Sequence, residues 1–481
     1  MIFSDQDVLQ IKSHGLNTDD VINQIEKFKL GFPFVDIVKP AVCSDGVIKC
    51  DNSQCEKYVK LYDEYAKSHK IVKFVPASGA ATRMFKDLFE FISSHVINQT
   101  ARMVVTNINK FAFWDDLRQF LPQSTTDFNI IDTIITDSGL NYGNQPKALI
   151  AFHKYTDYAK TPLEEHLDEG AEYAKSVDGV NIHFTISPEH RHGFEGLLNR
   201  VIPQYESEYG VKYNVSLSEQ KLSTDTIAVN SDNTPFRNDD GSLLFRPAGH
   251  GALIENLNDI DADLIFIKNI DNVTIKSLRD ETVLYKKVLA GMLVELQNRV
   301  FGLIHEIDSG TADINQVHEF ITKNLGIKLD KQLGLSEYRK ILNRPIRVCG
   351  MVKNTGAPGG GPFWVRDCDG NISLQIIEAS QIAPESKHMM QAAEYFNPVD
   401  LVCGVKDFQN NKFDLREYID DNTGFISEKS KNGRDLRAME RPGLWNGAMA
   451  KWNTVFIDVP ASTFAPVKVV TDLLNAAHQT K

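Results

Sequence analysis

The sequence predicts an α/β fold with a mostly parallel sheet that helices cover on both faces. Short apolar runs rich in β-branched residues alternate with longer segments whose apolar residues recur at helical spacing, which is typical of this class. Hydrophobic residues make up 42% and charged residues 24% of the chain, as in ordinary globular proteins. The 481 residues exceed what one simple core accommodates, so we expect a main domain with smaller parts appended or inserted.

Residues 1–70 are predicted to form an N-terminal helical cap. The segments TDDVINQIEKFKL (18–30) and CEKYVKLYDEYAKSH (55–69) both place their apolar residues at helical intervals, and a turn-rich connection separates them.

Residues 71–400 are predicted to form the main α/β core. It begins with the strand IVKFVP (71–76), a turn of small residues and the helix ATRMFKDLFEFISSHV (81–96). The dipeptide Gly370-Asn371 predicts a hairpin between the last two strands. Further strands are expected at 180–186, 211–218, 225–229, 262–271, 344–352, 361–367 and 372–378, and helices at 189–208 and up to about residue 307.

Residues 401–481 are predicted to form a small C-terminal α/β part that packs on the core. It contains the strand NTVFIDVP (453–460) and a closing helix over FAPVKVVTDLLNAAHQ (464–479). No internal repeat or low-complexity linker separates it from the rest of the chain, so we expect the parts to pack as one body.

The formal charge of -12 argues against a nucleic-acid or membrane partner, because an acidic surface attracts neither. A phosphate-bearing ligand must therefore meet a locally basic cleft. The N-terminus has no basic region followed by an apolar core, and no apolar run reaches membrane-spanning length. We therefore expect a cytoplasmic protein, and the sequence does not allow a protein partner to be predicted.

The turn after the first core strand, VPASGAATRMFK (75–86), has the composition of an anion-binding loop. Small residues between a buried strand and a helix N-terminus expose backbone N–H groups and the positive end of the helix dipole. Ala77, Ser78 and Gly79 suit that geometry, while Thr82 adds a hydroxyl donor and Arg83 a cation. The alternative is a plain strand-to-helix turn with surface charges.

This turn resembles the LxAGGxGTRM signature of the sugar-nucleotide pyrophosphorylases, and further similar segments follow in the family's order. PKALI (146–150) and TPLEEHL (161–167) resemble the PKxLxP segment and its helix. FTISPEH, VSLSEQKLS, FRPAGHGAL and ADLIFIKNIDNV are similar to four successive motifs of the UDP-sugar pyrophosphorylases, for UDP-glucose or UDP-N-acetylglucosamine. The chain is identified as a DUF4301-type protein that resembles these enzymes, and the branch name alone implies no substrate.

The resemblance implies a nucleotidyltransferase core of the GT-A or Rossmann-like type over residues 71–400. About sixty residues separate Arg83 from Lys147, far more than in the family. Because structureless loops of that length are uncommon, we expect a helical insertion at about 87–140.

The resemblance also implies the residues that contact phosphate and metal. Arg83, Lys147 and the lysine of FAPVK, Lys468, are implied as catalytic phosphate ligands. Asp271 stands at the end of an apolar strand, where α/β sheets present their ligand sites, and its carboxylate is suited to hold Mg²⁺. The alternative for Asp271 is a strand-end residue that caps the next helix.

Base and sugar contacts are implied by the later motifs. Gly249, His250 and Gly251 would let the backbone approach a nucleobase, and Gln220 has the donor and acceptor that reading a base edge requires. A structural role for His250 is an equal alternative. Two later segments imply sugar contacts, at Gly350 and Glu378 in the first and at Asn397 in the second.

Two more segments stand out by composition. Gly359, Gly360 and Gly361 suit a flexible lid or phosphate cradle, and equally the entry to a hairpin. ERPGLWNGAMAKW (440–452) combines two tryptophans with convergent polar groups, which favours a place in the substrate pocket over a core contact.

The expected reaction joins a nucleoside triphosphate, with UTP favoured by the resemblance, to a sugar 1-phosphate and releases pyrophosphate. Positioning and charge neutralisation with Mg²⁺ suffice for it, and no protein nucleophile is needed. Two alternatives stay open. One is a GT-A-like glycosyltransferase that consumes an NDP-sugar, and the other is a non-catalytic nucleotide or sugar-phosphate binding protein.

Overall fold

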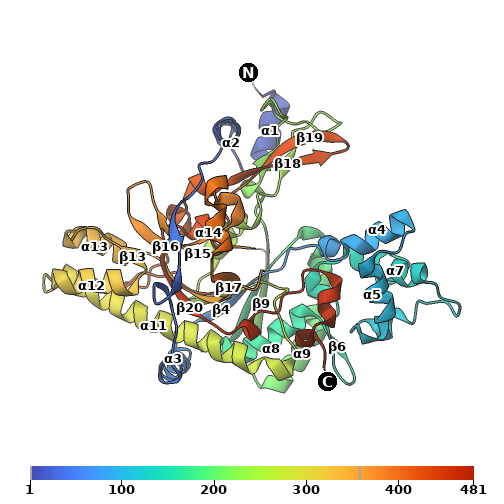
Figure 1. Cartoon of the computed structure of the whole chain (residues 1–481), viewed down its shortest axis with the longest axis horizontal. Helices are drawn as coiled ribbons and strands as arrows, with labels where there is room; N and C mark the ends of the chain where they lie inside the picture. The colour runs from blue at the N-terminus through green and yellow to red at the C-terminus, as the bar shows by residue number, and fades with distance from the viewer. Residues whose placement is uncertain (1–2, 357–358, 481) are drawn as a thin grey trace. The chain divides into compact units, whose positions relative to one another are not determined.

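The computed structural model describes residues 3–356 and 359–480 (Figure 1), and contacts along the chain divide it into two compact units. Unit 1 consists of Met1–Gln54, Gln220–Asp263 and Met292–Asp458, and unit 2 of Cys55–Glu219, Leu264–Gly291 and Val459–Lys481. The units interleave along the chain. The expected boundaries at residues 70 and 400 therefore lie inside segments of unit 2 and unit 1.

Unit 2 is built on a parallel sheet in which β12, β4, β8 and β9 are neighbours in that order. Every residue of β12 is buried, and so is all of β4 except its last residue, because strands covered on both faces need continuous apolar sequence. The short β7 pairs antiparallel with the start of β8, and β5 with β6. The strands are β4 (Ile71–Pro76), β5 (His153–Lys154), β6 (Ala159–Lys160), β7 (Lys175–Ser176), β8 (Gly179–Ile186), β9 (Tyr213–Glu219) and β12 (Leu264–Lys268).

The helices of unit 2 include α8, which packs on β8 through Leu163 and Leu167. Thr161 caps α8 and forms a capping box with Glu164. The helices are α3 (Asn52–Tyr65), α4 (Lys86–Ser94), α5 (Gln99–Thr106), α6 (Trp114–Leu117), α7 (Asp127–Ile135), α8 (Pro162–Tyr173), α9 (Arg191–Tyr209) and the first part of α11 (Asp280–Asp308). The 3-10 turns are η1 (Ala81–Arg83), η2 (Ile108–Lys110), η3 (Tyr142–Asn144), η4 (Lys147–Leu149), η5 (Pro188–His190), η8 (Lys276–Leu278), η14 (Ala461–Thr463), η15 (Val470–Leu474) and η16 (Ala476–His478).

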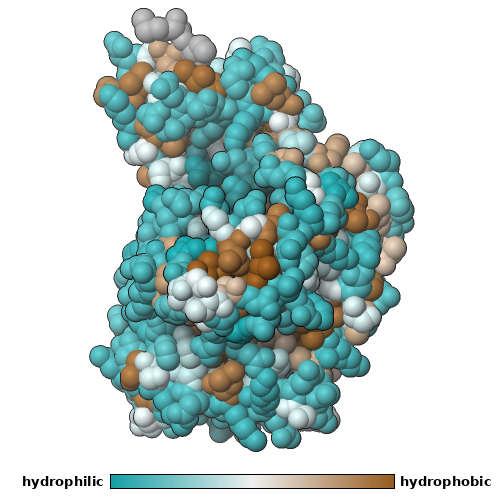
Figure 2. Space-filling model, turned by 90° about the vertical axis from the view of Figure 1, so that its left-hand side faces the viewer, coloured by the Kyte–Doolittle hydropathy of each residue, from teal (hydrophilic) through white to brown (hydrophobic). Residues whose placement is uncertain are grey.

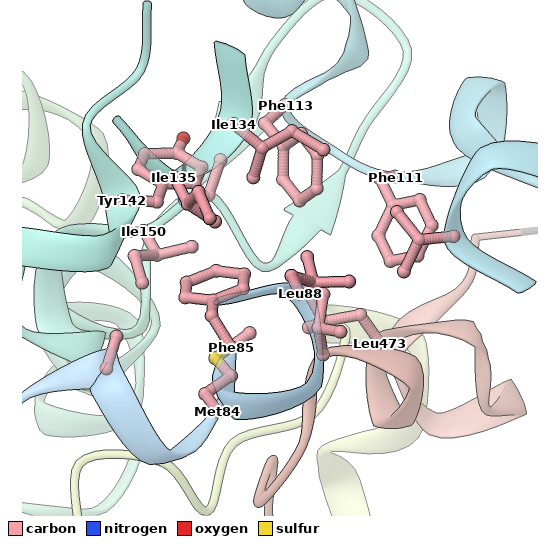
Figure 3. Packing of buried hydrophobic residues seen from close by; sticks show 14 of the residues in the cluster. Met84, Phe85, Leu88, Phe111, Phe113, Ile134, Ile135, Tyr142, Ile150 and Leu473 are labelled. Atoms are coloured by element: carbon pink, nitrogen blue, oxygen red, sulfur yellow. Dashed lines mark hydrogen bonds between the residues drawn. The ribbon is translucent and has the colours of Figure 1, made fainter. Parts of the chain in front are cut away.

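The segment expected to be a helical insertion contains α4, α5, α6 and α7, and it has a hydrophobic core of its own. Phe85, Leu88 and Phe113 are fully buried there, and the core also takes in Val470 and Leu473 from near the C-terminus. Figure 3 shows Phe85, Leu88 and Leu473 gathered in this core. The last residues of unit 2 are therefore packed against its helical segment.

Most strands of unit 1 fall into two larger sets of paired strands. In one, β2, β3, β20 and β14 are parallel neighbours and β14 pairs antiparallel with β17. The other is antiparallel, in the order β1, β15, β16 and β13. β15 and β16 form the hairpin predicted at Gly370-Asn371, with Gly370 at a positive φ of 86°.

The remaining elements of unit 1 are short helices and two more antiparallel pairs, β10 with β11 and β18 with β19. Its strands are β1 (Asp36–Pro40), β2 (Val42–Cys43), β3 (Gly46–Ile48), β10 (Thr226–Ile227), β11 (Phe245–Arg246), β13 (Ile327–Lys328), β14 (Ile346–Lys353), β15 (Gly361–Arg366), β16 (Ile372–Ile377), β17 (Tyr395–Gly404), β18 (Phe425–Lys431), β19 (Arg434–Glu440) and β20 (Asn453–Asp458). Its helices are α1 (Asp5–Ser13), α2 (Thr18–Leu30), α10 (Ile254–Asp259), the rest of α11, α12 (Ile314–Asn324), α13 (Leu335–Leu342) and α14 (Lys387–Gln391), with the 3-10 turns η6 (Leu222–Thr224), η7 (His250–Leu253), η9 (Ala379–Gln381), η10 (Pro384–Ser386), η11 (Leu415–Tyr418), η12 (Asp421–Thr423) and η13 (Gly447–Met449).

The α/β class with mostly parallel strands is confirmed, and two helix predictions are corrected. The prediction of a closing helix over 464–479 is wrong, since η15 and η16 are single 3-10 turns. The apolar side chains of this segment pack instead into the core formed with α4 to α7. The helix expected from residue 81 begins only at Lys86, after the turn η1.

Hydrophobic residues on the face shown in Figure 2 occur in small groups among hydrophilic ones. Scattered apolar side chains of this kind are normal for a protein surface. In the parts of the chain that the structure describes, no helix has the length and apolar character that crossing a membrane requires.

Candidate functional site

The predicted phosphate-binding loop follows β4 and is tied to the turn that carries Lys147. The Ala77 N–H donates to the Thr185 carbonyl at 2.9 Å, which ends the strand pairing with β8. Ala80 then pairs with Pro146, and the Lys147 N–H donates to the Gly79 carbonyl at 3.3 Å. Two segments that the sequence places about sixty residues apart are thus neighbours in unit 2.

The loop differs from the predicted strand, turn and helix in how it presents donors. Because η1 intervenes, the N-terminus of α4 lies at Lys86, away from Ser78 and Gly79, and the expected contribution of the helix dipole there is corrected. Within the described residues, the backbone N–H groups of Ser78, Gly79 and Ala80 have no hydrogen-bond partner. Gly79 and Ala80 are exposed. The loop therefore offers backbone donors directly, as anion-binding turns do.

Asp271 lies just beyond the end of β12 and receives two lysines on one oxygen. Lys147 Nζ lies 2.7 Å and Lys468 Nζ 3.1 Å from Asp271 Oδ2. Lys147 also donates to the Val467 carbonyl at 2.6 Å, and the Val467 N–H donates to the Asp271 carbonyl at 3.0 Å. The structure thus brings together three of the four predicted phosphate- or metal-binding side chains, from three distant segments of unit 2.

The ionised states of Asp271, Lys147 and Lys468 stabilise one another in partly buried surroundings. Burial opposes ionisation of Asp271, but Lys147 and Lys468 outweigh it and lower the pKa of the carboxyl below its ordinary value. Burial lowers the pKa of Lys147, and Asp271 offsets only part of that shift. Lys468 is 54% exposed, so its attraction to Asp271 is weakened by water.

The fourth predicted ligand, Arg83, lies on η1 and is exposed, like Thr82 beside it. No hydrogen bond or ion pair of Arg83 is found in the described part of the chain, whereas Lys147 and Lys468 are both engaged. A guanidinium group that is not already paired keeps its five donors for a ligand.

The donor set fits Mg²⁺ only in company with phosphate. Asp271 supplies one carboxylate, and Mg²⁺ in nucleotide sites is commonly bound through one or two carboxylates with phosphate oxygens and water completing the shell. Over residues 3–356 and 359–480, no group of three or more His, Cys, Asp or Glu side chains is arranged to hold a metal. The residues present therefore suit a metal that arrives with a triphosphate.

Beneath the cluster lies a buried ionic network that sequence reasoning missed. Lys73 of β4 and Lys268 of β12 both bind Glu169 of α8, at 2.8 Å and 2.7 Å, and all three are almost fully buried. Burial lowers the pKa of Lys73 to about 7. The signal for this network was a lysine inside each of two apolar strands, IVKFVP and LIFIK. Glu169 joins the strand that leads to the loop with the strand that leads to Asp271.

His166, one turn before Glu169 on α8, connects this network to the site. Its Nε2 lies 3.3 Å from the Ile270 carbonyl, and since a carbonyl can only accept, Nε2 carries the proton. Burial moves the pKa of His166 well below its usual range, so the ring is neutral. His166 therefore fixes the backbone immediately before Asp271.

The predicted base-contacting residues all lie in unit 1. Gly249 and Gly251 stand close to other protein groups: a Cβ on Gly249 would come within 2.3 Å of Glu440 Oε2, and one on Gly251 within 2.0 Å of the Pro442 carbonyl. The close approach that these glycines permit is thus made by residues 440–442. Gln220 donates to Asp225 Oδ1 at 3.2 Å. Contact of these three residues with a nucleobase stays a prediction.

The predicted sugar-contacting residues also lie in unit 1, where Glu378 is partly buried beside His250 and Trp445. Asn397 Oδ1 accepts from the Val399 N–H at 3.0 Å, where β17 is irregular and Val399 has a positive φ of 60°. Gly350 stands opposite this irregularity on β14, in register with Asp400. Asn397 and Gly350 therefore shape the strand pair, and their contact with sugar stays a prediction.

Gly359 and Gly360, singled out as a lid or as the entry to a hairpin, are close-packed. A Cβ on Gly359 would come within 2.5 Å of the Phe396 ring, and one on Gly360 within 3.2 Å of Glu378 Cγ. β15 begins at Gly361, so the hairpin entry is the arrangement that the structure contains. The neighbouring residues 357 and 358 lie outside the described residues.

Two solved structures of pyrophosphorylases are similar to this chain. UDP-glucose pyrophosphorylase from Leishmania major is 14% identical, with 97% of this chain and 77% of that chain covered and a TM-score of 0.46. Uridine diphosphate N-acetylglucosamine pyrophosphorylase from Trypanosoma brucei is 10% identical over 95% and 74% of the two chains, with a TM-score of 0.50, which is a likeness of fold. No curated protein matches the chain. The model of the family described as Domain of unknown function (DUF4301) matches residues 4–479, and the chain therefore belongs to this family.

Proposed function

We propose that this chain is a sugar-1-phosphate nucleotidyltransferase, which forms an NDP-sugar and pyrophosphate from a nucleoside triphosphate and a sugar 1-phosphate. The observation that carries the proposal is the convergence of Lys147 and Lys468 on Asp271, next to a loop whose backbone N–H groups have no partner among the residues described. A triphosphate is a dense polyanion, and it needs cations and donors placed in advance around it. The fold likeness to a pyrophosphorylase supports the same assignment.

In the proposed reaction an oxygen of the sugar 1-phosphate attacks the α-phosphorus in line, and the bond to the departing pyrophosphate breaks. The loop N–H groups and Arg83 bind the triphosphate, while Lys147 and Lys468 neutralise charge on the phosphates. Asp271 keeps the two ammonium groups in position before the ligand arrives. Asp271, together with the phosphates, would hold Mg²⁺, and the ion would supply further charge neutralisation when bound.

The base and sugar contacts are proposed from the sequence resemblance. Gln220 and the backbone at residues 249–251 would contact the base, for which UTP is the first candidate. Glu378 would accept hydrogen bonds from sugar hydroxyl groups, and Gly350 and Asn397 would border it.

The test is a pyrophosphate-release screen of each common NTP against a panel of sugar 1-phosphates, with Mg²⁺ and with EDTA. We expect Mg²⁺-dependent release, and Asp271→Asn and Lys147→Ala should each reduce it about 100-fold or more while the circular dichroism spectrum stays unchanged. Asp137→Asn, an exposed aspartate of the same unit, is the matched control and should retain activity. A fully active Asp271→Asn protein would contradict the site.

The same reagents separate the alternatives. Release of UDP from a UDP-sugar without pyrophosphate exchange would indicate a glycosyltransferase. Binding of nucleotide without turnover of any pair in the screen would indicate a non-catalytic binding protein.

A further inference from the structure

The segment 440–452 of unit 1, which the proposed reaction leaves without a role, contains two tryptophans in different surroundings. Trp452 is 3% exposed and so belongs to the core rather than to a pocket, and its indole N–H has no hydrogen-bond partner among the residues described. Trp445 is partly exposed, and its indole N–H donates to Glu378 Oε1 at 3.2 Å. Trp445 and Trp452 can therefore be compared, because among the described residues the first indole N–H has a hydrogen-bond partner and the second has none.

His250 approaches the same oxygen of Glu378. The Leu444 N–H donates to His250 Nδ1 at 3.0 Å, so the neutral ring carries its proton on Nε2. This Nε2 lies 3.6 Å from Glu378 Oε1, and the imidazole stacks on the Trp445 indole with ring centroids 4.1 Å apart and planes at 13°. Both N–H groups therefore face Oε1.

The Glu378 carboxylate is held in its ionised state, and one of its oxygens is available to a ligand. Burial opposes ionisation of Glu378, but His250 and Trp445 outweigh it and hold the pKa below its ordinary value. The Glu378 side chain is 25% exposed, and no hydrogen bond to Oε2 is found in the described ranges 3–356 and 359–480. Oε2 thus retains its capacity to accept a hydrogen bond from a ligand.

Glu378 and Trp445 are also joined through their backbones and neighbours. Gln381 Oε1 accepts from the Glu378 N–H at 3.0 Å and from Asn446 Nδ2 at 2.9 Å. On the other side, Arg347 Nη1 donates to the Trp445 carbonyl at 2.5 Å. Arg347 is fully buried, and no carboxylate pairs with it within the described chain. Its guanidinium therefore helps to hold the backbone of this segment in place.

We propose that Trp445 is a positioning and specificity-determining residue, which holds Glu378 Oε1 so that Oε2 accepts a hydrogen bond from one hydroxyl group of the sugar. The proposal rests on the proposed function, in which Glu378 faces the sugar 1-phosphate. A carboxylate fixed in this way rejects an analogue that lacks the hydroxyl, because the oxygen would then stay without its partner. A freely rotating carboxylate discriminates less.

The kinetic test uses Trp445→Phe, which keeps an aromatic ring against His250 and removes the N–H donor. We expect the KM for the better substrate of glucose 1-phosphate and N-acetylglucosamine 1-phosphate to rise about tenfold, because one hydrogen bond to a charged group is lost. The KM for UTP should stay unchanged. Trp452→Phe should leave both values unchanged. One monodeoxy derivative of that substrate should be a much poorer substrate than the parent compound for the wild type. Trp445→Phe should use this derivative almost as well as the parent compound.

A second measurement does not depend on activity. In a ¹H–¹⁵N spectrum, the Trp445 indole resonance should shift in an acidic step as Glu378 becomes protonated, and Glu378→Gln should abolish that step, whatever separate step the stacked His250 contributes. The Trp452 resonance should not respond. Equal kinetic losses in Trp445→Phe and Trp452→Phe, or an acidic step of the indole titration that is unchanged in Glu378→Gln, would overturn the inference. An inactive wild-type protein would contradict the proposed function, and the indole titration would still decide whether Trp445 holds Glu378.

Discussion

At the scale of single residues, Asp271 is the group on which the cluster in unit 2 depends. It offers one oxygen to two lysines that differ in exposure, Lys147 at 12% and Lys468 at 54%. The buried pair interacts in a medium of lower dielectric constant, whereas water screens the exposed pair. The contribution of Asp271 to stability therefore comes mainly through Lys147.

Asp271→Asn should destabilise the protein, and the loss should depend on pH. Breaking a largely buried ion pair costs about 3 kcal/mol at pH 7. Because the folded-state pKa of Asp271 is lowered, its contribution is fully present above the ordinary value of 3.8 and is lost as pH falls below it. Urea unfolding of wild type and variant at pH 7 and pH 3 measures the difference, which should shrink at pH 3. A difference independent of pH would show that the ion pairs do not cause it.

At the scale of elements, the segment that carries Lys468 is placed by its packing. Val467 and Val470 on either side of Lys468 are fully buried in the core formed by α4 to α7, and the Val470 N–H donates to the Met84 carbonyl at 3.1 Å. The helical segment therefore positions a proposed phosphate ligand that lies far away in the sequence.

Leu473→Ala, in the same core, should lower both stability and activity. Removing a fully buried leucine side chain costs about 2–5 kcal/mol, and it loosens the segment that holds Lys468. The measurements are urea unfolding and pyrophosphate release at a temperature where both proteins are folded. Val469→Ala is the control, because Val469 is 42% exposed and should change stability by less than about 0.5 kcal/mol. Equal effects in the two variants would argue against the role of this core.

Glu169→Gln tests the ionic network that joins α8 to β4 and β12. The substitution keeps the shape of the side chain but leaves Lys73 and Lys268 buried without their carboxylate, so we expect a loss of about 3–5 kcal/mol in the free energy of unfolding. Glu189→Gln, whose side chain is 66% exposed, should be within about 0.5 kcal/mol of wild type. A Glu169→Gln protein as stable as wild type would mean that the network is replaceable.

At the scale of the whole molecule, ligand binding should raise the temperature of unfolding. A ligand at 100 times its Kd adds about 2.7 kcal/mol, which for a chain of this length corresponds to a shift of about 2–3 °C. We expect this shift with UTP and Mg²⁺, a smaller one with UTP and EDTA, and almost none for Asp271→Asn. Asp137→Asn should respond like wild type in differential scanning fluorimetry. An undiminished shift for Asp271→Asn would place the nucleotide elsewhere.

Local pattern was enough to predict much of the fold. The strands at 71–76 and 180–186 and the hairpin at Gly370 follow from apolar periodicity and turn residues, which act over a few neighbours. The prediction of a closing helix was wrong because its apolar residues pack in a core with α4 to α7. No local pattern reveals this core. The prediction that the helix α4 begins at residue 81 was also wrong. Ala80, just before the turn η1, pairs with Pro146, which is distant in the sequence, and α4 begins only after that turn.

The sequence by itself determined the fold class, the family resemblance and the identity of the candidate ligands, because composition, periodicity and ordered motifs are local properties. Only the tertiary structure decided that Lys147 and Lys468 share one oxygen of Asp271, that Glu169 holds two strands together, and that Trp445 holds Glu378. Each of these is a contact between distant segments. Such contacts depend on how sheets and helices close against one another, and burial then sets the charge state of the groups that meet.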